Sequence, residues 1–113
     1  MSRQRSAPRL ASLPRREVAG REVPVAVGLR SRLLGLAYLD RSEAGPGLLI
    51  PRCSSVHTFG MRFALDLVFL DEQGAPVAVR LGVAPRRFAS CRGAAAVLEA
   101  PAGAGGEFAA LLP

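Results

Sequence analysis

The chain has 113 residues, half of them hydrophobic, which is typical of one globular domain with its own core. Its formal net charge is +6, but the basic residues are all arginines scattered along the chain and aromatic residues make up only 5%, so a nucleic-acid partner is not expected. No apolar run reaches the roughly 18 residues of a membrane span and no secretory signal is evident, so we predict a cytoplasmic protein without a membrane partner.

Two regions are expected. Residues 1–20, rich in Arg, Ser and Pro, predict a flexible basic N-terminal arm, and residues 21–113 predict a single compact domain. The domain is expected to open with a strand in "REVPVAVG", whose valines alternate along one face.

A short helix is predicted next, in "LRSRLLGLAYLD". Ser31 is the expected N-cap. Gly35 inside a helix costs about 1 kcal/mol relative to alanine, so we interpret it as a point where another backbone comes close. The apolar residues at helical spacing, expected to form the buried face, are Leu29, Leu33, Leu36 and Ala37.

The remainder of the chain predicts strands. "GLLIPRC" is a short apolar run, and "LDLVFLD" is apolar on both faces, as in a strand at the centre of a core. "DEQG" then predicts a turn and "APVAVRL" the returning strand of a hairpin. Further strands are predicted around Phe88 and in "AAAVLEA", with one helical turn in the tail. The expected fold is therefore α+β and mainly β: a small, highly curved sheet or partly closed β-barrel with one short helix after the first strand.

Asp66 lies between Leu65 and Leu67 in the predicted central strand. Because an unpaired carboxylate is costly to bury, we expect it to accept hydrogen bonds from Arg62, His57, another arginine or backbone amides. A structural role, tying the preceding loop to the strand, is favoured over a general base or ligand anchor.

His57 is the only histidine, and Cys53 precedes it by four residues. Catalysis by Asp66 with His57 or Cys53 is conceivable, but only if the fold brings them together. The spacing matches no standard zinc site, so neither a metal nor a cofactor is expected. Cys53 and Cys91 are expected to be free thiols, and the sequence leaves open whether they lie near each other.

"TFGMRF" places Met61 among alternating apolar residues, with Arg62 beside it. Such a stripe is more often core or groove lining than a cofactor site. If it lines a cleft, arginines at the rim could hold an anionic group. The predicted ligand-binding residues are His57, Met61, Arg62, Asp66 and Arg87.

Three segments, "SRLLGL", "GLLIPRCSSVHTFGMRFALDLVFLDEQG" and "FASCRGAAAVLEAPAG", together resemble domain-of-unknown-function family 192, small bacterial and archaeal proteins. The resemblance covers roughly residues 22–103, with Ala64 where that family usually has proline. It implies a compact β-rich α+β fold and no established activity. It also singles out Gly35, Asp71 and Glu99, which we interpret as structural. Asp71 is expected in the hairpin turn, and Glu99 is expected either to pair with an arginine of the "PRR" loop or to be an exposed strand-edge carboxylate.

The favoured function is a non-catalytic binding module for a small polar or anionic ligand, in a cleft beside the "HTFGMRF" loop. An accessory protein that adds its edge strand to a partner ranks second, and an acid–base or nucleophilic enzyme third. The oligomeric state is left open.

Overall fold

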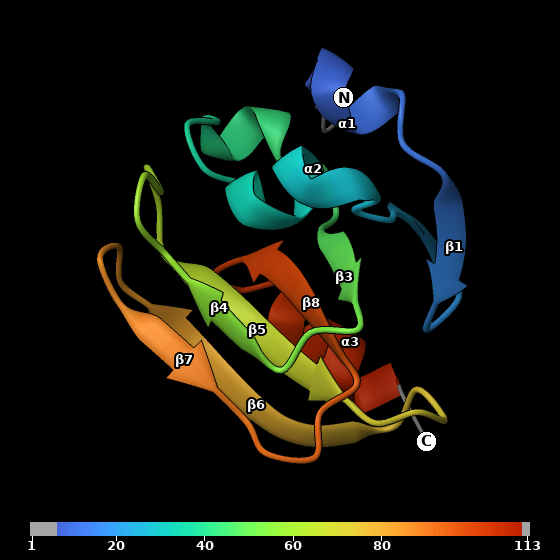
Figure 1. Cartoon of the computed structure of the whole chain (residues 1–113). Helices are drawn as coiled ribbons and strands as arrows, with labels where there is room; N and C mark the ends of the chain where they lie inside the picture. Colours follow the sequence, from blue (N-terminus) through green and yellow to red (C-terminus); the bar gives the residue numbers. More distant parts are fainter. Residues whose placement is uncertain (1–6, 112–113) are drawn as a thin grey trace.

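The computed structural model describes residues 7–111 and shows a mainly β protein with several short helices (Figure 1). The helical segments are α1 (Pro8–Ala11), α2 (Gly28–Leu34), the 3-10 turn η1 (Arg41–Glu43) and α3 (Gly105–Leu111). The strands are β1 (Arg15–Val18), β2 (Arg21–Pro24), β3 (Leu48–Pro51), β4 (Ser55–His57), β5 (Leu65–Leu70), β6 (Pro76–Val83), β7 (Phe88–Ser90) and β8 (Ala96–Pro101).

The strands form three sheets. The largest is antiparallel with the order β3-β8-β5-β6, while β1-β2 and β4-β7 are separate two-stranded ribbons. All six residues of β5 are buried, which confirms the prediction of a strand covered on both faces, and its hairpin with β6 is also confirmed. The partly closed barrel is not formed, because β3 and β6 remain at opposite edges of the large sheet.

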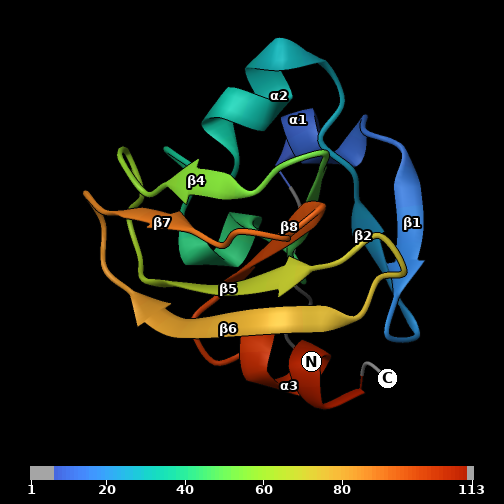
Figure 2. The same cartoon turned by 60° about the horizontal axis from the view of Figure 1, so that its bottom comes forward.

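The two faces of the large sheet are covered by different parts of the chain. Leu67 and Phe69 of β5 pack in one cluster with Leu10 of α1, whereas Val68 packs in a second cluster with Phe108 of α3. Figure 2 shows α3 against the face opposite to α1 and α2. Alternate residues of each central strand therefore point to different environments.

The N-terminal segment differs from the expected arm over its described part. Residues 7–20 contain α1 and β1, and Leu10 is 1% exposed while Val18 is also buried. With Ala7, three apolar residues of this segment are buried, which is too few to give a periodic pattern within its Arg- and Pro-rich sequence. Residues 1–6 lie outside the described part of the chain.

The predicted helix starts earlier than expected, and the face predicted to be buried is exposed. It begins at Gly28 with Val27 as its N-cap instead of Ser31, and it follows the second strand rather than the first. Leu29 and Leu33 are 73% and 57% exposed, respectively. The helix ends at Leu34 with Gly35 as its C-cap, so the buried Leu36 and Ala37 belong to the turn after it.

Candidate functional site

Glu99 occupies the middle of β8, between β3 and β5, and its register partners are Leu48 and Leu67. It shares a sheet face with Val97, which packs in the same cluster as Leu10 of α1. The residue is only 2% exposed. The expectation of an exposed strand-edge carboxylate is therefore wrong: β8 is an inner strand, flanked on both sides.

The carboxyl group of Glu99 is incompletely paired. It accepts a hydrogen bond from the Leu36 backbone N–H, but its Oε1 has no hydrogen-bond partner among residues 7–111. Neither of the two ion pairs in the described part of the chain involves it. Burial raises the pKa of Glu99 from 4.5 to about 7, against a smaller opposing effect of the Leu36 N–H. At neutral pH the group is thus poised to gain or lose a proton.

Gly35 is the residue that lets this carboxyl group sit beneath the turn after α2. Its backbone angles, φ 53° and ψ −127°, suit glycine, and a Cβ atom there would lie 2.5 Å from Oε1 of Glu99. A close neighbour is found at Gly35, but the prediction that it would be another backbone is wrong, because the neighbour is the Glu99 side chain. Arg9 of α1 secures this turn by donating to the carbonyl oxygens of Gly35 at 2.9 Å and Ala37 at 2.5 Å.

A pocket of about 150 Å³ lies over Glu99. Its walls are residues 32–35 at the end of α2, residues 55–57 of β4 and Phe88 of β7, while Glu99 comes from β8. Two of the lining side chains, Leu33 and Phe88, are strongly exposed, so part of the rim is apolar. The site thus combines a buried acid with an apolar rim, as small-molecule sites often do.

The two other titratable side chains of this pocket are already engaged. Nδ1 of His57 accepts the Phe59 backbone N–H at 3.2 Å, which leaves Nε2 to carry the proton of the neutral ring. The guanidinium of Arg32 donates to the carbonyl oxygens of Pro51 and Arg52 at the end of β3. Neither group forms an ion pair with Glu99.

Asp66 projects from the opposite face of the sheet, next to α3. Its Oδ1 accepts the Gly82 N–H at 2.8 Å, and its Oδ2 accepts those of Gly103 at 2.7 Å and Gly105 at 3.0 Å. Of the donors expected from the sequence, Asp66 therefore uses the backbone amides and none of the side chains. The carboxylate ties the bulge between β5 and β6 to the start of α3, and the structure does not bring it together with His57.

The other predicted site residues are dispersed. Arg62 pairs with Asp40 at 3.0 Å on the surface, Met61 is buried in the core, and Arg87 is exposed. Of the five predicted ligand-binding residues, only His57 lines the pocket over Glu99.

The predicted structural turn and the two thiols can also be placed. Asp71 serves the hairpin turn, where its Oδ1 accepts the backbone N–H groups of Gln73 and Ala75. Cys53 and Cys91 are free thiols on neighbouring segments, since the Cys91 N–H donates to the Ser54 carbonyl oxygen.

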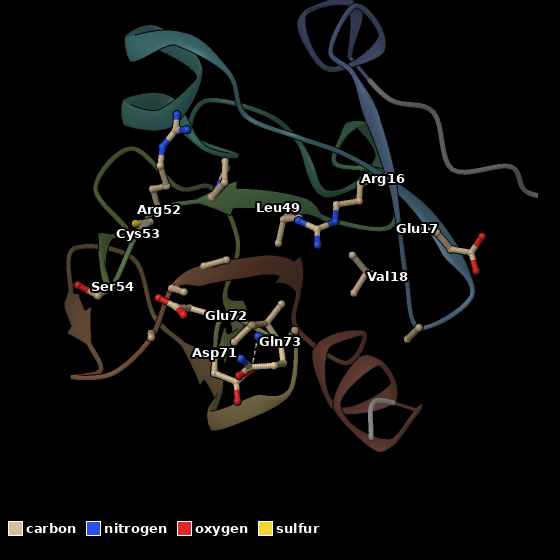
Figure 3. Close-up of a pocket in the computed structure, with 17 residues that line it drawn as sticks. Arg16, Glu17, Val18, Leu49, Arg52, Cys53, Ser54, Asp71, Glu72 and Gln73 are labelled. Atoms are coloured by element: carbon tan, nitrogen blue, oxygen red, sulfur yellow. Dashed lines mark hydrogen bonds between the residues drawn. The ribbon is translucent and has the colours of Figure 1, made fainter.

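A larger pocket of about 750 Å³ lies between β1, the end of β3 and the turn at residues 71–74 (Figure 3). Cys53 and Asp71 line it, but no buried charged group does. Figure 3 shows Glu17 and Arg52 pointing away from its centre. The smaller pocket is the better candidate because it alone of these two contains a buried, incompletely paired acid.

The sequence contains a signal for a buried Glu99. In "AVLEAP" this carboxylate lies within an apolar strand, as Asp66 does in "LDLVFL", and would need a hydrogen-bond donor for the same reason. Among the described residues, no three His, Cys, Asp or Glu side chains gather as they would around a metal ion. Within the same residues, no helix has the length and apolar character to span a membrane.

Fold and pocket together define a small, mainly β protein with a buried acid under a surface pocket. The chain belongs to the DUF192 family, described as "Uncharacterized ACR", whose profile matches residues 13–109. The resemblance found in the sequence is thereby confirmed. No curated protein matches the chain.

Two solved structures share the fold. A protein of unknown function from Novosphingobium aromaticivorans is 18% identical with a TM-score of 0.60, over 75% of this chain and 66%, just under two thirds, of that one. A protein from Sinorhizobium meliloti named "putative transcription regulator" is 21% identical with a TM-score of 0.62, over 82% and 81% of the two chains. At these identities the similarity shows the fold alone.

Proposed function

We propose that the chain is a non-catalytic binding module that takes a small polar ligand in the pocket over Glu99, beside the "HTFGMRF" loop. The observation that carries the proposal is the buried Oε1 of Glu99, which has no partner among the described residues. A buried polar atom without a hydrogen bond costs about 1–3 kcal/mol, and a ligand that donates to it recovers that cost. Native proteins seldom leave such a group unpaired without a reason.

The size of the pocket limits the ligand. A cavity of about 150 Å³ is known to hold benzene, so the pocket of similar volume accepts a group of roughly six heavy atoms. Hydrogen-bond donors are favoured over anions, because an anion would require Glu99 to keep its proton. Arg62 and Arg87, the arginines expected to hold an anion, do not line this pocket.

A fragment screen tests the proposal. Small polar compounds are screened by their effect on the backbone amide NMR signals, and genuine ligands are expected to shift those of Gly35 and Leu36. Binding should weaken in Glu99→Gln and in Leu33→Gln. Leu29→Gln is the matched control, because Leu29 is an exposed leucine of the same helix that does not line the pocket.

Two outcomes of this screen contradict the proposal. One is the absence of any compound that shifts the Gly35 and Leu36 signals. The other is binding that does not change when Glu99 is replaced by glutamine, because the ligand would then not use the group on which the proposal depends.

A second candidate function is acid–base catalysis by Glu99, favoured by its pKa of about 7 and by His57 in the same pocket. Compounds that bind in the screen would be incubated with the protein and analysed by mass spectrometry. Conversion by the native chain and not by Glu99→Gln would establish catalysis. Unchanged compounds would leave the binding module as the function.

A further inference from the structure

The pocket over Glu99 holds an acid that the described part of the protein does not neutralise. Three of its lining residues are titratable or charged: Arg32 from α2, His57 from β4 and Glu99 from β8. The guanidinium of Arg32 keeps its charge, but it donates to two backbone carbonyls and forms no ion pair with Glu99, and His57 uses Nδ1 as an acceptor. Once ionised, the carboxylate would therefore lack both a hydrogen-bond donor at Oε1 and a countercharge.

We propose that the ligand carries a primary ammonium group on a short aliphatic chain, with the ammonium on Glu99 and the chain against Leu33 and Phe88. This inference rests on the proposed function and specifies the chemistry of its ligand. A hydroxyl group would satisfy the hydrogen bond alone, whereas an ammonium group supplies the donor and the missing positive charge together. The pairing matters because leaving one charge of a buried pair uncompensated is strongly unfavourable.

The rim of the pocket fits the rest of such a molecule. Leu33 is 57% exposed and Phe88 76%, so both present apolar surface to solvent until something covers them. The ring of Phe59 packs edge-on against that of Phe88, with 5.2 Å between the ring centroids. Aromatic faces also attract ammonium groups. With room for roughly six heavy atoms, the pocket suits an amine of four or five carbon atoms.

The composition of the chain shows that no lysine of the protein itself can supply an ammonium group to Glu99. The sequence contains no lysine, so no side chain of a second copy could bring an ammonium group to Glu99. Arginine carries a planar guanidinium that is larger and more weakly hydrated than an ammonium group. The occupant we infer is therefore a free small amine.

Three probes of nearly equal size but different charge test the inference: n-butylammonium, 1-butanol and butyrate. Each is titrated into the native chain while the amide signals of Gly35 and Leu36 and the carboxyl carbon signal of Glu99 are followed by NMR. Butylammonium is expected to bind most tightly and to lower the pKa of Glu99. Glu99→Gln should weaken its binding about tenfold or more, the equivalent of about 1.4 kcal/mol.

The pH profile separates a charge interaction from a merely structural effect. Because the ammonium group pairs with the ionised form, its affinity should rise up to about tenfold per pH unit until the pKa of Glu99, about 7, and level off above it. In Glu99→Gln this rise should be lost. A flat profile in the native chain would contradict the inference.

Failure of the inference and failure of the proposed function are distinguishable. If 1-butanol or butyrate binds as tightly as butylammonium and loses affinity in Glu99→Gln, the ammonium inference is wrong and the binding module stands. The same holds if butylammonium does not bind but the fragment screen finds another ligand that depends on Glu99. If neither the probes nor the screen gives such a ligand, both are wrong.

Discussion

Replacing Glu99 by glutamine is expected to stabilise the protein at alkaline pH and to change little at acidic pH. Glutamine has almost the same shape, and its side-chain oxygen can still accept the Leu36 N–H, but it never ionises. The native glutamic acid must either keep its proton or place a charge in a site that is 2% exposed. The two chains should therefore diverge as Glu99 is forced to ionise.

The size of the divergence follows from the pKa. Burial raises the pKa of Glu99 from 4.5 to about 7, so the folded state holds this proton more tightly than the unfolded state does. The stabilisation is fully present below about pH 4.5 and is lost as the pH rises through about 7. At about 1.36 kcal/mol per pKa unit, the loss is about 3 kcal/mol. The free energy of unfolding of Glu99→Gln minus that of the native chain should therefore be larger above pH 8 than at acidic pH, by about this amount.

Urea unfolding followed by circular dichroism measures the effect. Both chains are unfolded at several pH values between 4.5 and 8.5, with a reductant present because Cys53 and Cys91 are free thiols. Other titrating groups contribute equally to the two chains and cancel in the difference between their free energies of unfolding. Glu72→Gln, which replaces an exposed glutamate in the hairpin turn, is the control and should show no such trend. A difference for Glu99→Gln that stays constant across this pH range would refute the reasoning.

Three further predictions concern the groups that hold the fold and the pocket in place, each measured by urea unfolding. Asp66→Asn should destabilise the protein by about 2–4 kcal/mol, because both carboxylate oxygens accept backbone N–H groups, whereas Asp71→Asn should cost little, since one oxygen accepts both bonds there. Equal costs would contradict this. Gly35→Ala should lower the free energy of unfolding by at least about 2 kcal/mol. The cost should clearly exceed that of Gly74→Ala, because Gly74 also has a positive φ but has open space where a Cβ would lie. Similar costs would show that the contact with the buried acid is unimportant. Arg9→Ala should cost about 1–3 kcal/mol through its two lost hydrogen bonds, and an unchanged stability would mean that α1 does not secure the pocket.

The strands were the part of the fold most open to prediction. The run from Leu65 to Leu70 is apolar on both faces, and the strand, its central position and its hairpin follow from that pattern and the turn residues after it. Asp71 likewise follows from the chemistry of the turn. These features depend on residues close in sequence, so local propensity and periodicity suffice.

The helix shows that periodicity does not predict which face is buried. Leu29 and Leu33 recur at helical spacing, which predicts a buried face, yet both are exposed. Periodicity shows that the residues share a face, but the packing of distant segments decides whether anything covers it. Here the buried contacts are made by the turn after the helix, which Arg9 holds from another part of the chain.

The sequence by itself determined the strand pattern, the hairpin and the need of Asp66 for hydrogen-bond donors, because burying an unpaired carboxylate is costly wherever the strand lies. Only the tertiary structure decided that Asp66 and Glu99 occupy opposite faces of one sheet, with one fully paired and the other not. The difference arises because β3 and β5 enclose β8 while the turn at Gly35 closes over Glu99. Strand order is set by contacts between residues far apart in the chain, and the spacing of residues within one strand carries no record of them.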